Sequence, residues 1–179
     1  MRHISEVGSR ELCWTSIGCA QREYELRADG EVVACLHRQG GSFGVAETAN
    51  GSWSFERPGL RRSRVNVREA ASGSAVANFG SGWTGEGVLE TSQRKRFGWT
   101  PANFWRSRWE WRGAYGTPLV RFWSRQGLTR AEGRARIEGA SVILPELDLL
   151  VALGWYLIVM RARDATSDAV AATAGTAGS

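Results

Sequence analysis

Short runs in which apolar and polar residues alternate begin at Glu11 and continue through most of the chain. Tyr24 and Leu26, for example, alternate with charged neighbours. A two-residue period is typical of a β-strand with one covered face. Turn pairs such as Asp29-Gly30 and Asn50-Gly51 separate successive runs and predict hairpins. The pattern predicts about eleven or twelve consecutive antiparallel strands.

An uninterrupted apolar run, Leu149–Met160, follows the predicted strands. A helix over this run is apolar on every side, because it completes more than about three turns. Such a helix is buried either in a protein interior or in lipid. Its length of roughly 18 Å is shorter than the roughly 30 Å hydrocarbon layer of a bilayer, and Glu146 and Asp148, which precede it, are costly to place in lipid. A core helix is therefore the favoured interpretation, and a C-terminal membrane anchor is the alternative.

The predicted strands and the predicted helix require each other. Antiparallel strands paired in sequence leave two open edges unless the sheet closes, and a barrel of this size has a lumen that must be filled. A helix that is apolar all round fills it. The sequence thus predicts a mainly β fold, a closed antiparallel barrel of about 12 strands around a buried hydrophobic C-terminal helix. Wide aromatic rings are expected to point inward against this helix, at Trp53, Trp99, Trp109 and Trp111.

The expected domain organisation has three parts. Residues 1–10 are predicted to be a flexible N-terminus, residues 11–164 the barrel with its central helix at 145–163, and residues 165–179 a disordered tail. Pro145 suits the first turn of the helix, and Asp148 lies where the helix dipole favours negative charge.

Two stretches resemble a known family. Leu144–Ile158 contains a proline, a Leu-Asp pair and a long apolar run, and it is similar to the segment that leads into the terminal helix of phospholipid scramblases and LURP-one-related proteins. The aromatic residues between Phe97 and Trp111, followed by Gly116–Val120, are similar to late strands of uncharacterised bacterial members. The chain thus resembles the Tubby C-terminal-like superfamily over roughly residues 11–164, which implies a barrel around a helix and allows lipid-related functions.

The chain departs from that family where function is concerned. It has no proline-rich arm and no cysteine-rich acylation segment like those of scramblases. It also lacks an acidic calcium-loop pattern, and the phosphoinositide pocket of the Tubby domain cannot be matched residue by residue. Lipid scrambling and phosphoinositide binding are therefore implied by the resemblance without local support.

Basic charge supplies the strongest candidate site. The formal net charge is +5, and Lys95 is the one lysine among 23 basic residues. Arginine forms forked contacts with phosphate and carboxylate groups. If neighbouring hairpins bring them together, eight residues would form an anion site: Arg57, Arg61, Arg62, Arg64, Arg68, Arg94, Lys95 and Arg96. The alternative is that these side chains are solvated and discourage edge pairing of strands.

Enzymatic chemistry has little support in the sequence. The two histidines, His3 and His37, belong to no recognisable catalytic or metal-binding motif. The glycine-rich segment Gly80–Gly87 lacks the residues of a phosphate-binding loop and is interpreted as a turn. Cys13, Cys19 and Cys35 have neither CxxC nor zinc-ligand spacing. We expect no enzyme activity, no cofactor and no metal, and we assign Asp148 to the helix dipole rather than to catalysis.

The function expected from the sequence is a non-enzymatic binding module for anionic lipid headgroups or other phosphate-bearing ligands. The alternative is a protein-interaction or assembly domain with no small ligand. Alternation places Trp109 and Trp111 opposite Arg108 and Arg112, which disfavours nucleic acid as a partner. The N-terminus lacks the apolar stretch of a signal peptide, so we expect a cytoplasmic protein, peripheral at the membrane if lipid is the ligand. The oligomeric state stays open.

Overall fold

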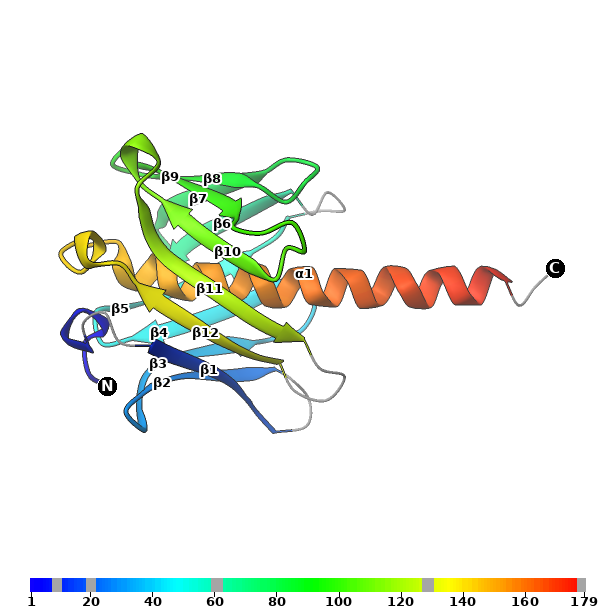
Figure 1. The fold of residues 1–179 in the computed structure, drawn as a ribbon, viewed down its shortest axis with the longest axis horizontal. Coiled ribbons are helices and arrows are strands. Elements are labelled where there is room, and N and C mark those ends of the chain that lie inside the picture. Colours follow the sequence, from blue (N-terminus) through cyan, green and yellow to red (C-terminus); the bar gives the residue numbers. More distant parts are fainter. Residues whose placement is uncertain (8–10, 19–21, 59–62, 127–130, 177–179) are drawn as a thin grey trace.

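Figure 1 shows the computed structural model, which describes residues 1–7, 11–18, 22–58, 63–126 and 131–176. Within these ranges, twelve antiparallel strands close into one barrel. Helix α1 (Leu147–Thr176) runs through the barrel and projects beyond it (Figure 1). The predicted fold class, a closed antiparallel barrel with a hydrophobic C-terminal helix, is confirmed.

The strands follow one another around the wall in chain order, and the ladder between the first and the last strand closes it. Their bounds are β1 (Glu11–Ile17), β2 (Glu23–Ala28), β3 (Glu31–Arg38), β4 (Phe43–Thr48), β5 (Gly51–Glu56), β6 (Arg64–Glu69), β7 (Ala75–Ser81), β8 (Gly87–Thr91), β9 (Arg96–Pro101), β10 (Arg108–Arg112), β11 (Pro118–Gln126) and β12 (Ala131–Ile137). Three short 3-10 helices accompany them, η1 (Ile4–Val7), η2 (Ala114–Gly116) and η3 (Gly139–Ser141).

The connections alternate between the two ends of the barrel because the strands run up and down. We call the end where α1 begins the proximal rim, and it carries η1, η2 and η3. We call the end from which α1 emerges the distal rim, and its loops follow the odd-numbered strands β1, β3, β5, β7, β9 and β11 (Figure 1). The strand that a loop follows therefore determines at which rim the loop lies.

The alternation seen in the sequence corresponds to the two faces of the wall. In β6, Val65 and Val67 are buried while Arg64 and Arg68 are exposed. Of the four tryptophans expected to face inward, three are buried and Trp53 is half-buried against the core. These side chains form one continuous core with the first half of α1.

Aromatic side chains join the wall to the helix. The ring of Trp155 on α1 stacks on Trp14 of β1, with a centroid separation of 5.5 Å and an angle of 2° between planes. Trp111 of β10 donates a hydrogen bond from Nε1 to the backbone oxygen of Leu150 on α1, at 2.7 Å. The buried indole thus has a polar partner inside the lumen, as buried tryptophans usually do.

Gly154 lets α1 approach the wall closely. A Cβ at this position would lie 2.4 Å from the ring of Phe122 and 2.9 Å from Nε1 of Trp111. Gly133 in β12 has the same role on the side of the wall, because a Cβ there would lie 2.2 Å from the ring of Trp155 on α1. Glycine is required at both positions because there is no room for a side chain.

The helix differs from the predicted range 145–163 at both ends. It begins at Leu147, since Pro145 and Glu146 form the turn that precedes it, and it continues to Thr176. The sequence predicted a disordered tail over residues 165–179, whereas the structure describes residues 165–176 as part of the helix, and residues 177–179 lie outside the described residues. The extension is alanine-rich, and alanine readily prolongs a helix that is already nucleated.

The N-terminus also differs from the flexible segment predicted for residues 1–10. Ile4 and Val7 of η1 are buried in the core, where they help to cover the proximal rim. Nδ1 of His3 lies 2.6 Å from Oδ1 of Asn50, and Arg2 forms an ion pair of 2.8 Å with Glu31. The apolar contacts of Ile4 and Val7 with the core hold η1 in place. Residues 8–10 lie outside the described part of the chain.

Candidate functional site

The basic residues singled out in the sequence do not form one patch. Arg57 and Arg64 flank the connection from β5 to β6, at the distal rim. Arg68 lies near the β6–β7 hairpin, while Arg94 and Lys95 form part of the β8–β9 hairpin, and both hairpins are at the proximal rim. Arg61 and Arg62 lie outside the described residues. The hypothesis of a single anion site built from all these residues is therefore wrong for those that the structure describes.

Several of these residues already have protein partners. Arg57 is buried and forms an ion pair of 2.8 Å with Asp164 of α1. Nζ of Lys95 lies 2.6 Å from Oε1 of Glu146. Arg68 donates to the backbone oxygen of Gly73 at 3.0 Å. These contacts fasten the helix or complete a turn, so they explain the residues without a ligand.

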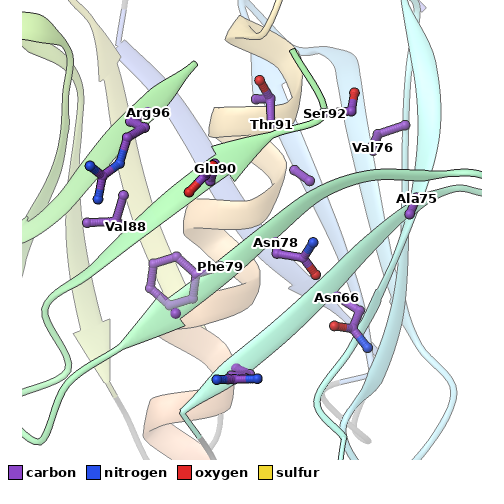
Figure 2. A pocket seen from close by; sticks show the side chains of 13 residues that line it. Asn66, Ala75, Val76, Asn78, Phe79, Val88, Glu90, Thr91, Ser92 and Arg96 are labelled. Atoms are coloured by element: carbon purple, nitrogen blue, oxygen red, sulfur yellow. The ribbon is translucent and has the colours of Figure 1, made fainter. Parts of the chain in front are cut away.

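Arg64 and Arg96 do share a groove, on the outer wall over β6, β7, β8 and β9 (Figure 2). The groove has a volume of about 560 Å³, and Asn66, Asn78 and Glu90 line it as well. Glu90 lies directly opposite Arg96 in the β8–β9 ladder. The carboxylate of Glu90 therefore offsets much of the attraction that this groove offers to an anion.

The distal rim carries a feature that the sequence analysis did not single out. Trp83, Phe104 and Trp105 are 98%, 90% and 84% exposed. Trp83 lies in the β7–β8 loop and the other two in the β9–β10 loop, which are neighbours at this rim (Figure 1). Large apolar side chains exposed on adjacent loops are a common feature of interaction surfaces. We call these three residues the rim aromatics.

Local hydrogen bonds hold the β9–β10 loop in shape. The side chain of Asn103 donates to Oγ of Ser107 at 2.9 Å and accepts from the backbone of Arg108 at 3.0 Å. Nε1 of Trp109 donates to the backbone oxygen of Arg106 at 2.9 Å, and Arg106 has a positive φ of 53°. The loop geometry therefore keeps Phe104 and Trp105 away from the core.

Arginines accompany the rim aromatics. Arg106 follows Trp105 directly and is exposed, as is Arg108. Arg161 of α1 lies over the ring of Trp109, with 4.8 Å from its guanidinium carbon to the ring centroid. Arg163 lies on the other side of the rim, where it donates a hydrogen bond to the backbone oxygen of Gly41 in the β3–β4 loop. Arg106 and Arg108 are thus the exposed arginines that accompany Phe104 and Trp105 on the same loop.

A cavity of about 750 Å³ opens at the distal rim between α1 and the wall from β5 to β10. We call it the distal cavity. Its lining is mainly apolar and includes Trp99, Trp109, Leu157, Ile158 and Met160, and charged side chains surround its opening, namely Arg57, Arg161, Asp164 and Asp168. Burial, followed by the charge of nearby Arg106, lowers the pKa of Arg161. The cavity therefore combines an apolar interior with a desolvated cation.

A buried carboxylate lies at the opposite rim. Asp148, in the first turn of α1, is 2% exposed. Burial raises its pKa, although hydrogen bonds from Thr48 and Asn50 partly oppose the change. Within the described residues no group of three or more His, Cys, Asp or Glu side chains is placed to hold a metal ion. Asp148 thus belongs to no such group in that part of the chain.

No family model, no curated protein and no solved structure matches the chain. The resemblance to the Tubby C-terminal-like superfamily therefore stays a prediction. In the described part of the chain, no helix has the length and apolar character needed to span a bilayer. The apolar run that suggested a membrane anchor lies inside the barrel instead.

Proposed function

We propose that the protein is a non-enzymatic module that docks on anionic membrane surfaces through the rim aromatics and the arginines beside them. The observation that carries the proposal is the gathering of three almost fully exposed aromatic rings on two adjacent loops. Tryptophan is favoured at the boundary between water and lipid because its ring is amphipathic. Arginine adds attraction to anionic headgroups.

The expected affinity is that of a reversible peripheral protein. Full burial of a large apolar side chain is worth about 1.5–3 kcal/mol, so partial burial of three rings supplies roughly 2–4 kcal/mol. Each arginine near an anionic leaflet adds about 1 kcal/mol. Trp83, Phe104 and Trp105 thus provide anchoring, and Arg106 and Arg108 provide selection for negative charge.

The position of α1 restricts the docking orientation. The helix projects from the distal rim, while the two aromatic loops lie together on one side of it (Figure 1). A tilted approach brings these loops to the bilayer and lets the projecting part of α1 lie along the surface. Exposed polar residues on that part, such as Thr166 and Ser167, fit a position in water or among headgroups.

Sedimentation with vesicles tests the proposal. We expect binding to mixed phosphatidylserine and phosphatidylcholine vesicles, weakening with salt because the charges are screened over about 8 Å at physiological ionic strength. The triple variant Trp83→Ser/Phe104→Ser/Trp105→Ser is expected to bind at least about tenfold more weakly, a change of about 1.4 kcal/mol. The matched control is Tyr115→Ser/Ile143→Ser, which removes two similarly exposed apolar side chains from the proximal rim.

Two outcomes would count against membrane docking. One is failure of the protein to sediment with the anionic vesicles even at low salt. The other is equal binding by the triple variant and the control. A concentration-dependent molar mass that the triple variant abolishes, without any vesicle binding, would instead support the protein-interaction alternative, since tryptophan and arginine are also frequent in protein interfaces.

A further inference from the structure

The distal cavity has the features of a binding site for one small amphiphile. We propose that it binds a single-chain amphiphile with an anionic head, such as a fatty-acid carboxylate or a lysophospholipid phosphate, with the chain in the cavity and the head at Arg161. This activity goes beyond docking on a bilayer, because the ligand is one soluble molecule rather than a surface. The argument rests on the cavity, on the environment of Arg161 and on the loop that positions it.

The interior of the cavity suits a hydrocarbon chain. Its volume of about 750 Å³ is within the usual range of ligand pockets. Trp99, Trp109, Ile158 and Met160 are at most 5% exposed, so the wall offers a dry apolar surface. Leu157 is half-buried and also lines the cavity. An apolar chain that enters here gains about 0.8 kcal/mol for each buried methylene group.

Arg161 supplies the group that would recognise an anionic head. It forms no ion pair with any residue in the described ranges, and its polar contact is a hydrogen bond of 3.4 Å from Nη1 to the backbone oxygen of Thr84. Asp164, the acidic residue nearest to it along α1, forms an ion pair of 2.8 Å with Arg57. A guanidinium that is partly desolvated and lacks a carboxylate partner favours an incoming anion.

The other charged groups around the opening leave this preference intact. The charge of Asp164 raises the pKa of Arg161 and so opposes the effect of burial, but Asp164 is also paired with Arg57 at 2.8 Å. Asp168 lies one helical turn beyond Asp164. Arg106 is close enough to lower the pKa of Arg161, so it adds positive potential at the same place. The cavity interior, by contrast, has no acidic side chain among the lining residues that the structure describes apart from these two aspartates.

Gly85 in the β7–β8 loop makes room for the guanidinium. Its φ is +83°, and a Cβ there would lie 2.0 Å from Nη1 of Arg161. An alanine at this position would displace the guanidinium while leaving its charge in the protein, and its positive φ would also strain the β7–β8 loop. The variant Gly85→Ala therefore tests whether an intact loop around Arg161, and not merely the charge of Arg161, is needed for binding.

A terminally brominated dodecanoate, used below its micelle concentration, is the probe. Bromine quenches nearby indoles, so we expect saturable loss of the emission of Trp99 and Trp109. Dodecyl phosphate should compete, and the two anionic probes together show whether carboxylate or phosphate is preferred. Dodecyltrimethylammonium has the same chain with a cationic head and is expected not to compete.

Variants locate the site. Arg161→Gln is expected to weaken binding at least about tenfold, because a hydrogen-bonded charge pair is lost. Leu157→Trp should block the cavity, and Gly85→Ala should weaken binding with Arg161 still present. Arg136→Gln, which changes an exposed arginine of β12 on the outer wall, is the matched control and should bind normally.

The result that would overturn the proposal is no saturable quenching, or equal binding by Arg161→Gln and Arg136→Gln. Competition by the cationic amphiphile would likewise contradict recognition of the head. The experiment contains no bilayer, so it is separate from the docking proposal. Phe104→Ser/Trp105→Ser should lose vesicle binding yet retain dodecanoate, because these two rings do not line the cavity.

Discussion

The two halves of α1 belong to the same helix but have opposite surroundings. Within Leu147–Met160 every side chain is buried except Leu157, which is half-buried. From Arg161 to Ala169 the side chains are half-buried or exposed. The first half is thus part of the core, and contacts of Arg57, Arg161 and Arg163 link the start of the second half to the distal rim. Packing fixes the first half, and polar contacts fix the start of the second.

This difference predicts that introducing a leucine has a large effect on stability in the first half and almost none in the second. Gly154→Leu forces a side chain into the rings of Phe122 and Trp111 and should destabilise the protein by about 3 kcal/mol or more. Ser167→Leu, on the exposed half, should change stability by less than about 0.5 kcal/mol. Urea denaturation of both variants measures the contrast, and similar midpoints would refute it.

An ion pair lies at each end of the buried half of α1, and the two pairs differ in how far they are exposed to solvent. Arg57→Gln removes the buried partner of Asp164 and should cost about 2 kcal/mol, less than the loss of a fully buried pair because Asp164 is 25% exposed. Lys95→Gln removes the partner of Glu146, but Lys95 is 44% exposed, so the loss should be at most about 0.5 kcal/mol.

The measurement is again the free energy of unfolding, taken at low and at high salt. Salt should reduce the effect of Lys95→Gln more than that of Arg57→Gln, because buried pairs are screened less. Equal losses from both substitutions at low salt would show that burial of Arg57 does not strengthen its link to α1.

Substitution of Asp148 is expected to have a smaller effect than that of Gly154 or Arg57, and in the stabilising direction. Burial raises its pKa from the ordinary value of 3.8, so the charged form is disfavoured in the folded protein. Asp148→Asn removes this penalty and should raise Tm at neutral pH by about 2–4 °C, the change that roughly 1 kcal/mol produces in a domain of this size. Glu86→Gln, at an exposed position of the β7–β8 loop, is the control and should leave Tm nearly unchanged.

The pH dependence follows from the direction of the shift. A carboxyl group with a raised pKa binds its proton more readily in the folded state, so its stabilising contribution is complete below the ordinary pKa and is lost as pH rises through the folded value. The advantage of Asp148→Asn should therefore shrink as pH falls toward 4. An advantage that stays constant with pH would contradict burial as the cause.

Much of the fold was predictable because it depends on local patterns. The alternation in β6 and the apolar run from Leu149 to Met160 determine which faces are buried, and a barrel with a filled lumen satisfies both. The end of the helix was not predictable in the same way, because residues 165–176 have no apolar pattern. Their helicity follows from the buried half that nucleates it.

The candidate site was harder to predict because it depends on which loops meet. Arg57 and Lys95 are both basic residues of predicted turns. Arg57 is nevertheless buried against α1 at the distal rim, whereas Lys95 is exposed at the proximal rim. Trp83 and Trp105 lie 22 residues apart in loops that become neighbours only when β7, β8 and β9 pair. Turn signals around Trp83, which is flanked by Gly82 and Gly85, were the available indication that its ring is exposed.

Closure of the wall by β1 and β12 has a consequence for synthesis on the ribosome. Glu11 and Arg134, whose side chains meet across this seam, are separated by 123 residues. Such distant pairing slows folding, and the helical plug is translated after both strands. A nascent chain therefore exposes the apolar inner face of its strands to water until α1 has been translated and can fill the lumen. Formation of the helix thus decides whether the strands made before it become a stable barrel.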